Sequence, residues 1–499
     1  MTVFDQLLQL RSSKGTRITQ GLSDENIKRF IETDPQLATA IELAVAEFDF
    51  IKSENPELID MDEQDQLQHI HEDYINFYAA DAVNPYVAVA GKGPWLITLK
   101  GAVLHDNGGY GMLGAGHAAD HVLETMAKPH VMANIMTPSY YQKRLSNLLK
   151  KEIGKSHDQC PFEKFICMNS GSEAVTVASR ISDVNAKKQT GMGGENYGKT
   201  IKIMALEGAF HGRTDRPAQY SDSSLKSYKK NLASFQGRNN LITVPINDIE
   251  TLKQAFADAE QNNEFIESFF IEPVMGEGNP GMAITPEFYA TARELTENHG
   301  TLFLVDSIQA GLRAQGCLSI CDYPGFESLP APDMETYSKA MNAGHYPMSV
   351  LALSKKAADL YVVGIYGNTM TANPKALDVA YTVLTHLTAE TRANIREKGA
   401  MFVNKLKQLQ EKMDGEISNV QGTGLLFSCE LGPEYRAYGK NSIEEYLRHH
   451  GLGVIHGGEN SLRFTPHFNI TEAEVNLIVD GVEQALIHGP KANSLDKAS

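Results

Sequence analysis

The sequence predicts an α/β protein: a large domain with a mostly parallel, mixed sheet flanked by helices, and a smaller α+β domain made from the N- and C-terminal parts of the chain. The first observation is an alternation of short apolar runs and helical patterns between about residues 130 and 385, which is typical of strands with covering helices. The second is that runs such as FEKFICM, TIKIMAL, ESFFIEPV and TLFLVDS are apolar at most positions, as in parallel strands buried on both faces. The third is size, because 499 residues of which 42% are hydrophobic can bury more than one core.

The N-terminal part, residues 1–125, is expected to contribute helices and one hairpin to the smaller domain. DPQLATAIELAVAEFDFIKSE places apolar residues three and four positions apart after an Asp-Pro start, a pattern that predicts a helix. GPWLITLKGAVLHDNGG then indicates two short strands around Lys100 and Gly101, which is a hairpin and not a crossover unit.

Residues 126–388 are expected to form the large domain, with helices such as EAVTVASRISDVNAKKQ and PEFYATARELTENHG covering its sheet. Residues 389–499 begin with a long charged helical pattern, ETRANIREKGAMFVNKLKQLQEKM, and continue with GTGLLFSCEL and SLRFTPHFNIT before a last helix. This final part is expected to complete the smaller domain.

Charge and composition exclude several classes of partner. Lys and Arg number 45 against 62 Asp and Glu, so the net charge is -17, which disfavours nucleic acid and anionic membrane surfaces. No stretch reaches the ~18–20 consecutive apolar residues of a spanning helix, and the first residues lack a signal-peptide pattern. Five cysteines form no disulfide framework, which favours a reducing cytoplasm. Cys317 and Cys321 have CxxxC spacing without a second ligand pair, so no metal site is expected.

One motif is discounted because of its context. Gly109, Gly111 and Gly114 spell GxGxxG, the fingerprint of a dinucleotide site when it joins a strand to a helix. Here it follows the expected hairpin, and Glu124 lies too early for the acidic residue that should stand about 20 positions further on. A nicotinamide or flavin enzyme is therefore the weakest functional alternative.

Polar residues directly after the apolar runs are the best candidates for chemistry, because parallel sheets bind ligands beyond the carboxyl ends of their strands. NSGSEA follows FEKFICM and opens a helix. Gly171 allows close approach of the backbone, Ser172 adds a hydroxyl, and the amides of the helix start attract an anion. This predicts a phosphate cradle, although a simple serine cap followed by Glu173 would explain the same letters.

Two further loops follow apolar runs. In EGAFHGRT, Phe210 could cover a flat ring and Arg213 could bind a carboxylate, with His211 between them; the alternative is a turn with a buried aromatic and an ordinary buried histidine. In IEPVMGEGNPG, Glu272 ends the run and Glu277 lies in the loop. Hydrogen bonding or pairing with arginine is favoured over a metal here, because no histidine stands at ligand spacing.

TLFLVDSIQAG delivers a carboxylate, Asp306, at the end of an apolar run, with Gln309 three positions later. Lys339 follows a short Thr-Tyr-Ser run and lies outside any charged helix face. Most single lysines are solvated surface groups. However, an amine beside a buried carboxylate, a phosphate cradle and a ring-covering aromatic is what an imine-forming aldehyde cofactor requires.

The motifs NSGSEA, GAFHGRT, IEPVMGEG, VDSIQAG, YSK, TMTANP and LRFTPHFNIT stand in this order over about 300 residues. Together they resemble the motif series of the class III pyridoxal-phosphate aminotransferases, the ω-aminotransferase subgroup of the aspartate-aminotransferase fold (fold type I). The resemblance implies pyridoxal 5'-phosphate as cofactor and a homodimer with active sites shared across the interface. It also implies that Lys339 forms the Schiff base and moves the catalytic proton, and that Asp306 pairs with the pyridine nitrogen.

The resemblance also implies the remaining roles. The further cofactor contacts would be Gly171, Ser172, Phe210, His211, Glu272, Gln309 and, reaching across from the partner subunit, Thr369. Arg463 would take the α-carboxylate of 2-oxoglutarate or glutamate, and Glu277 would mask this arginine when the other substrate is bound. Arg213 matches the position that grips the distal carboxylate in 4-aminobutyrate enzymes.

The chain departs from the family pattern at several positions. Members of the family usually have the sequence DEVQTGFGRTG where this chain has DSIQAGLRAQG, so Ser307 replaces a glutamate. Met275 stands where glutamine is common, Asn279-Pro280 replaces a glycine, and the segment CLSICDYPGFESLPAP is longer than usual. These positions flank the expected ring and substrate mouth, so the resemblance defines the cofactor chemistry better than the substrate.

We therefore expect a cytoplasmic, homodimeric transaminase. It would move an amino group from an ω-amino acid or diamine-type donor, similar to 4-aminobutyrate, ornithine or lysine, to 2-oxoglutarate by a ping-pong aldimine mechanism. Aminomutases, amino-acid epimerases and decarboxylating transaminases share the cofactor residues and are alternatives within the family. A catalytically silent cofactor-binding protein is an alternative from another class.

Overall fold

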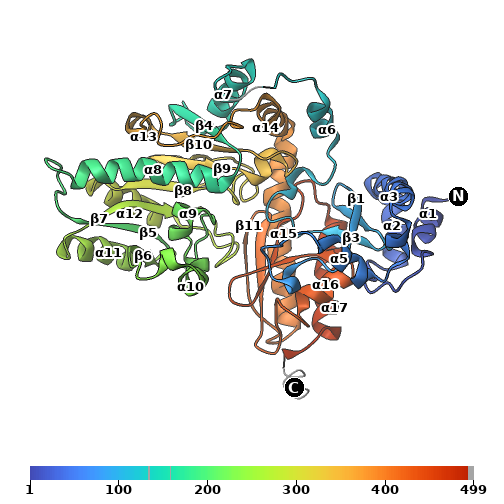
Figure 1. Ribbon diagram of the computed structural model, residues 1–499. Coiled ribbons are helices and arrows are strands. Elements are labelled where there is room, and N and C mark those ends of the chain that lie inside the picture. The colour runs from blue at the N-terminus through green and yellow to red at the C-terminus, as the bar shows by residue number, and fades with distance from the viewer. Residues whose placement is uncertain (133–134, 158, 493–499) are drawn as a thin grey trace. The chain divides into compact units, whose positions relative to one another are not determined.

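The computed structural model describes residues 1–132, 135–157 and 159–492. The chain forms two compact units (Figure 1). The first unit consists of residues 1–123, 397–421 and 427 onward, and the second consists of residues 124–396 and 422–426. The N- and C-terminal parts of the chain therefore belong to the same unit.

The second unit is built on a seven-stranded sheet. Its strands, in spatial order, are β4 (Lys164–Met168), β10 (Ser349–Leu353), β9 (Met334–Tyr337), β8 (Leu302–Asp306), β7 (Glu264–Ile271), β5 (Thr200–Leu206) and β6 (Leu241–Val244). β10 is antiparallel to both of its neighbours, and the remaining neighbours are parallel to each other. Among the strands of this sheet, six therefore share one direction, and the expected mostly parallel sheet is confirmed.

Helices cover both faces of this sheet. α8 (Gly171–Thr190) and α13 (Lys355–Leu360) pack on one face, and α11 (Ile249–Gln261) and α12 (Pro286–Asn298) pack on the other (Figure 1). β8 contributes side chains to the hydrophobic cores on both faces of the sheet, because alternate strand residues point to opposite faces. Leu302 and Leu304 lie in the core with α8, whereas Phe303 and Val305 lie in the core with α12. Each such side chain contributes about 1.5–3 kcal/mol by leaving water.

Cap residues fix where these helices begin. Ser170 accepts a hydrogen bond from the Glu173 backbone N–H, and Glu173 reciprocates in a capping box at the start of α8. Thr285 caps α12, and Pro286 at its first position is preorganised for the helix. Further helices of this unit are α7 (Tyr140–Glu152), α9 (Asp215–Tyr220), α10 (Asp222–Asn231) and α14 (Pro374–His386), with short 3-10 turns η3 (Ala233–Phe235), η4 (Ile320–Asp322) and η5 (Lys339–Asn342).

The first unit contains the predicted hairpin. β2 (Trp95–Thr98) and β3 (Val103–Asp106) are antiparallel, with Gly101 at a positive φ of 71° in the turn between them. β1 (Ala88–Lys92) and β13 (Leu452–Gly453) extend this sheet on its two sides. The discounted glycine motif follows β3 and lies in an irregular turn with η2 (Leu113–Ala115). A Cβ on Gly114 would lie 2.6 Å from the Phe468 ring, so this glycine allows close packing.

N-terminal helices pack on this hairpin sheet. α3 (Pro35–Glu54), the helix predicted from the Asp-Pro start, contacts β1 and β2. Asp34 caps it and also accepts a hydrogen bond from Trp95 Nε1 at 2.6 Å. The other helical elements of this segment are α1 (Val3–Arg11), α2 (Asp24–Thr33), α4 (Pro56–Asp60), α5 (Glu63–His71) and η1 (Ala80–Ala82). A short helix, α6 (Asp120–Ala127), begins in this stretch and ends in the second unit.

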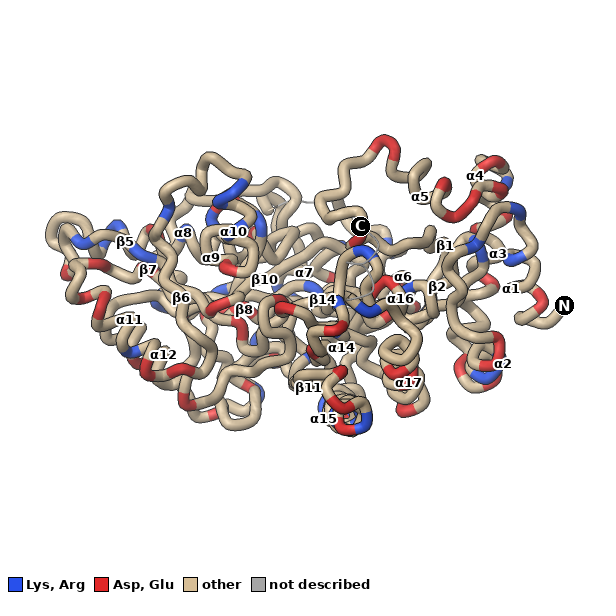
Figure 2. The backbone as a smooth tube through the Cα atoms, turned by 90° about the horizontal axis from the view of Figure 1, so that it is seen from below, with Lys and Arg blue, Asp and Glu red and all other residues tan. Residues whose placement is uncertain are grey.

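The C-terminal part adds a second four-stranded sheet. Its order is β11 (Ile417–Thr423), β12 (Leu426–Leu431), β15 (Ser461–Phe464) and β14 (Ile455–Gly457). The helices are α15 (Ala389–Lys412), α16 (Ile443–His449) and α17 (Glu472–His488). α15 carries both acidic and basic residues, as its charged sequence pattern predicts (Figure 2). In the described part of the chain, no helix is long and apolar enough to cross a membrane.

Candidate active site

Five of the predicted motif loops lie at one edge of the seven-stranded sheet. The parallel strands β4, β5, β7, β8 and β9 all end at this edge, which is where open parallel sheets bind ligands. Each strand is followed by one of the polar loops that the sequence singled out. The fold therefore explains why residues up to about 170 positions apart in the chain come together.

Asp306 ends β8 and is buried. Its Oδ2 lies 2.8 Å from His211 Nδ1, and its Oδ1 accepts hydrogen bonds from Thr336 Oγ1 at 3.0 Å and from the Ile308 backbone N–H at 3.2 Å. The Thr336 hydroxyl and the Ile308 N–H are donors, so one carboxyl oxygen is fixed by two hydrogen bonds while the other contacts His211. The side chain is thus held in a fixed position and shielded from water.

Lys339 is half-buried at the first position of η5, just after β9. Its φ is +47°, in the left-handed region that costs most residues free energy. Strained backbone of this kind clusters at functional sites, where the surrounding structure enforces it. β9 runs beside β8 with Thr336 opposite Asp306, so the lysine leaves the sheet one short turn beyond the carboxylate.

Glu272 follows β7 and connects two of the loops. Its Oε2 accepts a hydrogen bond from the Phe210 backbone N–H at 3.2 Å, and its Oε1 accepts one from the Gly276 N–H at 3.1 Å. Burial raises the pKa of Glu272 to about 7, although the nearby His211 and these two bonds oppose the rise. Glu272 thus joins the loop after β5 to the loop after β7 through two backbone amides.

Gln309 lies against the loop that follows β7. A Cβ on Gly276 would come within 1.8 Å of Gln309 Oε1, so only glycine leaves room for this amide. Gln309 Nε2 is buried and has no hydrogen-bond partner in the described part of the chain. An orphaned buried donor is costly, which makes it a candidate to bind an acceptor atom of a ligand.

The expected phosphate cradle lies at the start of α8. Ser172 Oγ is 2.7 Å from Thr214 Oγ1 and accepts a hydrogen bond from the Thr214 N–H at 3.2 Å. Gly212 has φ +114°, and a Cβ there would lie 2.5 Å from Ser172 Oγ. The residue that caps α8 is Ser170, so the alternative of a serine cap applies to Ser170 and leaves the Ser172 hydroxyl at the helix start.

The three other side chains predicted near this edge are more accessible. Phe210 is half-buried, and the exposed Arg213 places its guanidinium carbon 5.3 Å from the centre of the Phe210 ring. This is a cation–π contact. Glu277 is half-buried in the loop after β7.

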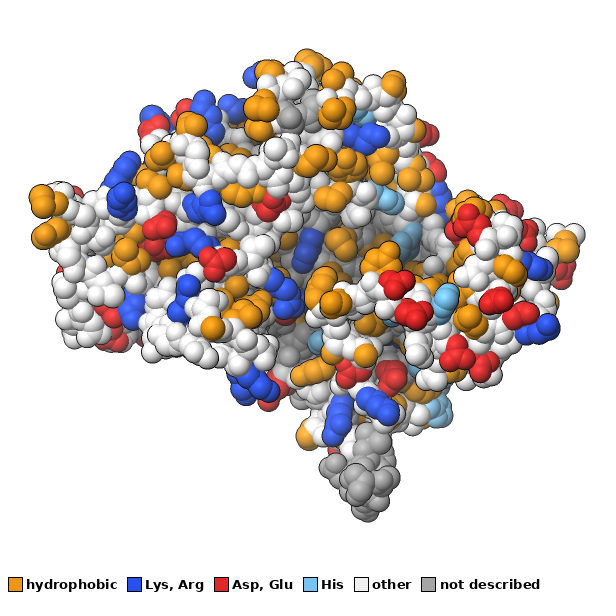
Figure 3. Space-filling view, viewed as in Figure 1, with side chains coloured by type: hydrophobic (Ala, Val, Ile, Leu, Met, Phe, Trp, Pro, Cys, Tyr) orange, Lys and Arg blue, Asp and Glu red, His pale blue; other side chains and the backbone are white. Residues whose placement is uncertain are grey.

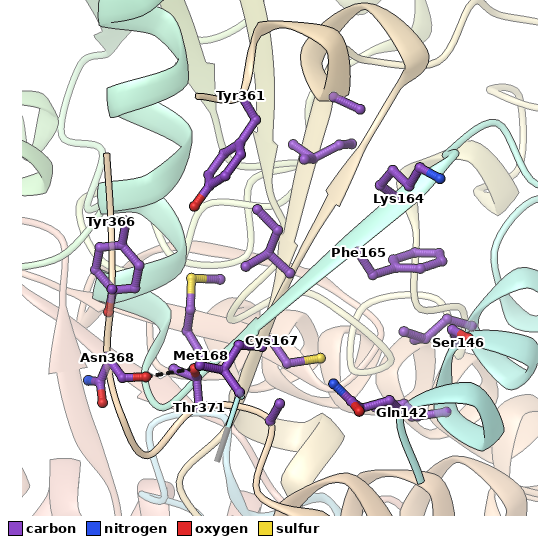
Figure 4. A pocket seen from close by; sticks show the side chains of 18 residues that line it. Gln142, Ser146, Lys164, Phe165, Cys167, Met168, Tyr361, Tyr366, Asn368 and Thr371 are labelled. Atoms are coloured by element: carbon purple, nitrogen blue, oxygen red, sulfur yellow. Dashed lines mark hydrogen bonds between the residues drawn. The ribbon is translucent and has the colours of Figure 1, made fainter. Parts of the chain in front are cut away.

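Thr369 is exposed in the loop 361–372, beside a residue that is tied to the cradle. Asn368 Nδ2 and Tyr366 OH both donate to Glu173 Oε1, at 2.7 and 2.5 Å. Figure 4 shows Tyr366 and Asn368 on this loop, with Thr371 Oγ1 donating to the Asn368 carbonyl at 2.8 Å. The first turn of α8 therefore anchors the loop that carries Thr369.

Arg463 belongs to the first unit and is buried on β15. Its guanidinium carbon lies 5.5 Å from the centre of the Tyr110 ring, which in turn stacks on Tyr78 at 5.9 Å. Burial raises the pKa of Tyr110 to about 12, and its φ is +50°. Sequence reasoning missed both tyrosines, although Tyr110 stands inside the glycine motif that it discounted.

The positions that depart from the family pattern are mostly buried. Ser307 and Met275 are almost fully enclosed. Arg313 is also buried, and its Nη1 donates to the Leu425 carbonyl at 3.1 Å. Burial lowers the pKa of Arg313 to about 9.

A buried cluster in the first unit has the composition of a metal site. His105 Nε2 and His467 Nε2 lie 3.0 and 2.8 Å from the same oxygen of Glu474. A metal-bound histidine normally donates its other ring N–H to a partner. His105 Nδ1 is buried without a hydrogen-bond partner in the described residues, so we interpret the cluster as a hydrogen-bonded carboxylate.

The site of the second unit fits one class of ligand. A half-buried lysine, a buried carboxyl group with fixed partners, an unpartnered amide and a helix start suit a phosphorylated pyridine aldehyde. The orphaned Gln309 Nε2 needs an acceptor such as a ring oxygen. Fold and site together thus define a pyridoxal-phosphate enzyme of fold type I.

The family follows from comparison with known proteins. Residues 77–486 match the model of the family described as aminotransferase class-III, so the chain belongs to this family. The chain is 28% identical over 403 residues to ornithine aminotransferase 2 of Staphylococcus aureus, covering 80% of this chain and 93% of the relative. Ornithine aminotransferase of Brevibacillus brevis is 27% identical over 408 residues, with 81% and 94% covered.

Solved structures agree in fold. An ornithine aminotransferase from Toxoplasma gondii ME49 superimposes with a TM-score of 0.73 at 23% identity, covering 88% of this chain and 98% of that one. An acetylornithine aminotransferase from Elizabethkingia anophelis reaches 0.67 at 22% identity, covering 85% and 99%. The predicted family, fold class and cofactor are confirmed, and the protein is a pyridoxal-phosphate-dependent transaminase.

Proposed function

We propose that the protein transfers the amino group of an ω-amino acid or diamine-type donor, of the ornithine type, to 2-oxoglutarate in two half-reactions. The observation that carries the chemistry is the junction of β8 and β9, where the carboxylate of Asp306 and the strained Lys339 leave adjacent strands. The donor class rests on the relatives, several of which are named ornithine aminotransferases.

The cofactor, when bound, supplies an electron-poor ring that accepts the electron pair left on a substrate carbon after a proton is removed. Asp306, positioned by His211 and Thr336, would pair with a ring nitrogen and keep that nitrogen protonated. Lys339 would act as the base and acid that moves the proton between two carbon atoms.

The other residues of the sheet edge would bind and orient the cofactor. Gln309 Nε2 would donate to a ring oxygen, which satisfies its orphaned N–H. Gly171 and Ser172 at the start of α8 would hold the phosphate. Phe210 would stack on the ring, and Glu272 would orient the Phe210 and Gly276 amides that it already binds.

We propose substrate roles for three charged residues. Arg463 would bind the α-carboxylate of 2-oxoglutarate or glutamate, because a buried guanidinium favours a bidentate carboxylate partner. Glu277 would mask it when the other substrate is bound, and Arg213 would contact a distal carboxylate. The Tyr110 ring beside Arg463 supports a fixed orientation of this guanidinium.

We also propose that the enzyme is a homodimer of two-domain chains, in which Thr369 contributes to the cofactor site of the partner subunit. Large apolar side chains are exposed around α7 and the loop 361–372 (Figure 3). They are Val131, Met132, Ile135, Met136, Tyr140, Val362, Val363 and Met370. Contiguous apolar surface of this kind marks interaction sites. A cavity of about 400 Å³ opens along β4, α7 and the same loop (Figure 4).

A cytoplasmic location is part of the proposal. The five cysteines are all free thiols, which suits a reducing compartment. The negative net charge argues against nucleic acid and membranes as partners.

The central experiment follows the cofactor and then the product. Purified protein with added pyridoxal phosphate should absorb in the visible range, and borohydride should fix the cofactor to Lys339, as peptide mass mapping would reveal; Lys339→Ala is the control. Glutamate formed from 2-oxoglutarate should appear with terminal amines such as ornithine. A protein that ignores the cofactor would contradict the whole proposal. Racemisation or carbon dioxide release without amino transfer would instead point to an epimerase, mutase or decarboxylase.

A further inference from the structure

β9 carries a buried carboxyl group that the proposed chemistry does not use. Glu335 lies opposite Val305 of β8, and the next residue, Thr336, lies opposite Asp306. Neighbouring strand residues point to opposite faces. Thr336 therefore reaches Asp306 on one face, while Glu335 points to the other and is fully buried.

On that face, Glu335 binds three hydrogen-bond donors. Its Oε1 accepts from Ser307 Oγ at 2.6 Å and from the Ile320 N–H at 3.0 Å. Its Oε2 accepts from Ser319 Oγ at 2.5 Å. A buried carboxyl is costly unless donors satisfy it, so these contacts account for its presence in the core.

Ser307 connects this carboxyl to the cofactor site. It directly follows Asp306, and its backbone N–H donates to the Thr336 carbonyl at 3.0 Å. Ser307 is thus held by β9 through its backbone on one side and through its hydroxyl on the other. Because Asp306 and Ser307 are consecutive in the chain, any shift of Ser307 also moves Asp306.

We propose that Glu335 is a positioning residue for the cofactor: through Ser307 it holds the end of β8, and with it Asp306, in register with the strand that leads to Lys339. The proposal rests on the proposed roles of Asp306 and Lys339. A ring bound at one end by the carboxylate and at the other by the amine needs a fixed distance between β8 and β9, because small misplacements of reacting groups are costly.

The sequence context supports this role. Ser307 stands where the family usually has glutamate, and in this chain a carboxyl reaches the Ser307 hydroxyl from β9. The same carboxyl binds Ser319 and Ile320 in the segment that is longer than usual. Glu335 therefore connects both the segment that contains Ser319 and Ile320 and the end of β8 to β9 by hydrogen bonds.

The charge state of Glu335 changes near neutral pH. Burial raises the pKa of Glu335 to about 7, against the opposing effect of the serine and backbone hydrogen bonds. The other titratable groups in its surroundings have raised pKa values and are uncharged at pH 7: Tyr337 on β9, Tyr289 on α12, Tyr323 and Cys321 in the following segment, and Cys160 before β4. The bonds of the ionised form, present above pH 7, are charge-assisted and stronger, so the positioning effect increases as the pH rises through 7.

Matched serine variants separate a positioning role from a purely structural one. Ser307→Ala removes the hydroxyl on the cofactor side of Glu335, and Ser319→Ala removes the hydroxyl on the other side. The measurements are the Kd of pyridoxal phosphate by equilibrium dialysis, the visible absorbance of the bound cofactor between pH 6 and 9, and Tm. Glu335→Gln keeps the size of the side chain and removes its charge.

Ser307→Ala and Glu335→Gln should each raise the Kd about tenfold at pH 8, the effect of losing one charge-assisted hydrogen bond. In the wild type the absorbance of the bound cofactor should change as the pH rises through 7, and Glu335→Gln should remove this change. Ser319→Ala should lower Tm while changing the Kd by less than about twofold. Equal losses of Tm in both serine variants, with the wild-type Kd and pH profile retained, would overturn the proposal. Ser307→Ala alone decides this point if Glu335→Gln does not fold.

The outcome is independent of the substrate. Wild-type protein that binds the cofactor but forms no glutamate would contradict the proposed function alone, because neither the Kd nor the spectrum needs turnover. A Kd that rises equally in Ser307→Ala and Ser319→Ala would also overturn the proposal, since it would show a general loosening of the core.

Discussion

His211 Nδ1 lies 2.8 Å from Asp306 Oδ2, and both side chains are buried. The loop that follows β5 and the last residue of β8 are thereby joined at the edge of the sheet. Thr336 Oγ1 and the Ile308 N–H donate to the other oxygen, Oδ1. Both oxygens of the carboxyl group are therefore held in place. A charge held in this way is preorganised for a cationic partner.

Replacing this charge should slow catalysis more than it weakens cofactor binding. Asp306→Asn keeps the shape but cannot stabilise a protonated ring nitrogen, so each half-reaction should slow by about 10²–10³-fold, as stopped-flow absorbance would measure. Thr336→Val removes only one hydrogen bond to the carboxylate and should cost about tenfold. An Asp306→Asn enzyme within about tenfold of wild type would show that Asp306 does not bind the ring.

Gly276→Ala should disturb cofactor binding through Gln309. The new methyl would lie 1.8 Å from Gln309 Oε1, so the amide must move. We expect a cofactor Kd at least about tenfold higher, since the proposed hydrogen bond from Gln309 to the ring would be lost. The double variant Gly276→Ala/Gln309→Ala should be less impaired than the sum of the two single changes, because the alanine at 309 relieves the clash. Additive effects in this cycle would contradict the steric explanation.

The positions of the four motif loops could be predicted from the sequence. Parallel strands end at one edge, and each predicted strand is followed by a distinctive group of letters, so Gly171, Phe210, Glu272 and Asp306 had to lie near each other. The start of α8 was predictable to within two residues, and only the capping geometry shows that Ser170 is the cap.

Contacts that depend on strand register could not be predicted. Thr336 and Glu335 lie in a short run that shows no recognisable motif. Their hydrogen-bond partners can be identified only when the register between β9 and β8 is known. The hydrogen bond from Asn368 to Glu173 joins residues 195 positions apart, and Asn368 lies in a loop without a regular sequence pattern. Tyr110 was overlooked because it stands inside the glycine motif that resembles a dinucleotide-binding fingerprint.

The exposed apolar surface around loop 361–372 should control dimer formation. Val363 is 92% exposed, and Val363→Asp would place a charge in the proposed interface at a large desolvation cost. We expect a shift from dimer to monomer, measured by light scattering after size exclusion, with weaker cofactor binding. Met192→Asp, at a residue 93% exposed outside this surface, is the matched control. An unchanged mass for Val363→Asp would place the interface elsewhere.

Arg463→Ala should impair the use of 2-oxoglutarate and spare the cofactor. Loss of a charge-assisted hydrogen bond to a carboxylate should slow this half-reaction by about 10–100-fold, while the visible spectrum of the bound cofactor stays as in wild type. Arg463→Lys keeps the charge without the planar fork and should be intermediate. Because Arg463 is buried, Tm is measured in parallel. A normal rate with 2-oxoglutarate would show that another residue binds the carboxylate.

The cluster of His105, His467 and Glu474 should link stability to pH. Burial by itself would raise the pKa of Glu474, but the hydrogen bonds and charges of the two imidazoles lower it below its ordinary value. A lowered folded-state pKa means that the unfolded chain takes up protons first as the pH falls. The stabilisation is therefore present above the ordinary pKa of 4.5 and is lost progressively at lower pH.

Glu474→Gln should lower the free energy of unfolding by about 1–3 kcal/mol at pH 7, because the ionised acceptor of two buried imidazoles is lost. Urea unfolding as a function of pH would measure this, and the difference from wild type should shrink as the pH falls below about 4.5. Glu472→Gln removes the same charge two residues earlier, at an exposed position of the same helix turn, and should change stability by less than about 0.5 kcal/mol. A Glu474→Gln difference that stays constant down to acid pH would mean that the cluster contributes by packing and not by charge.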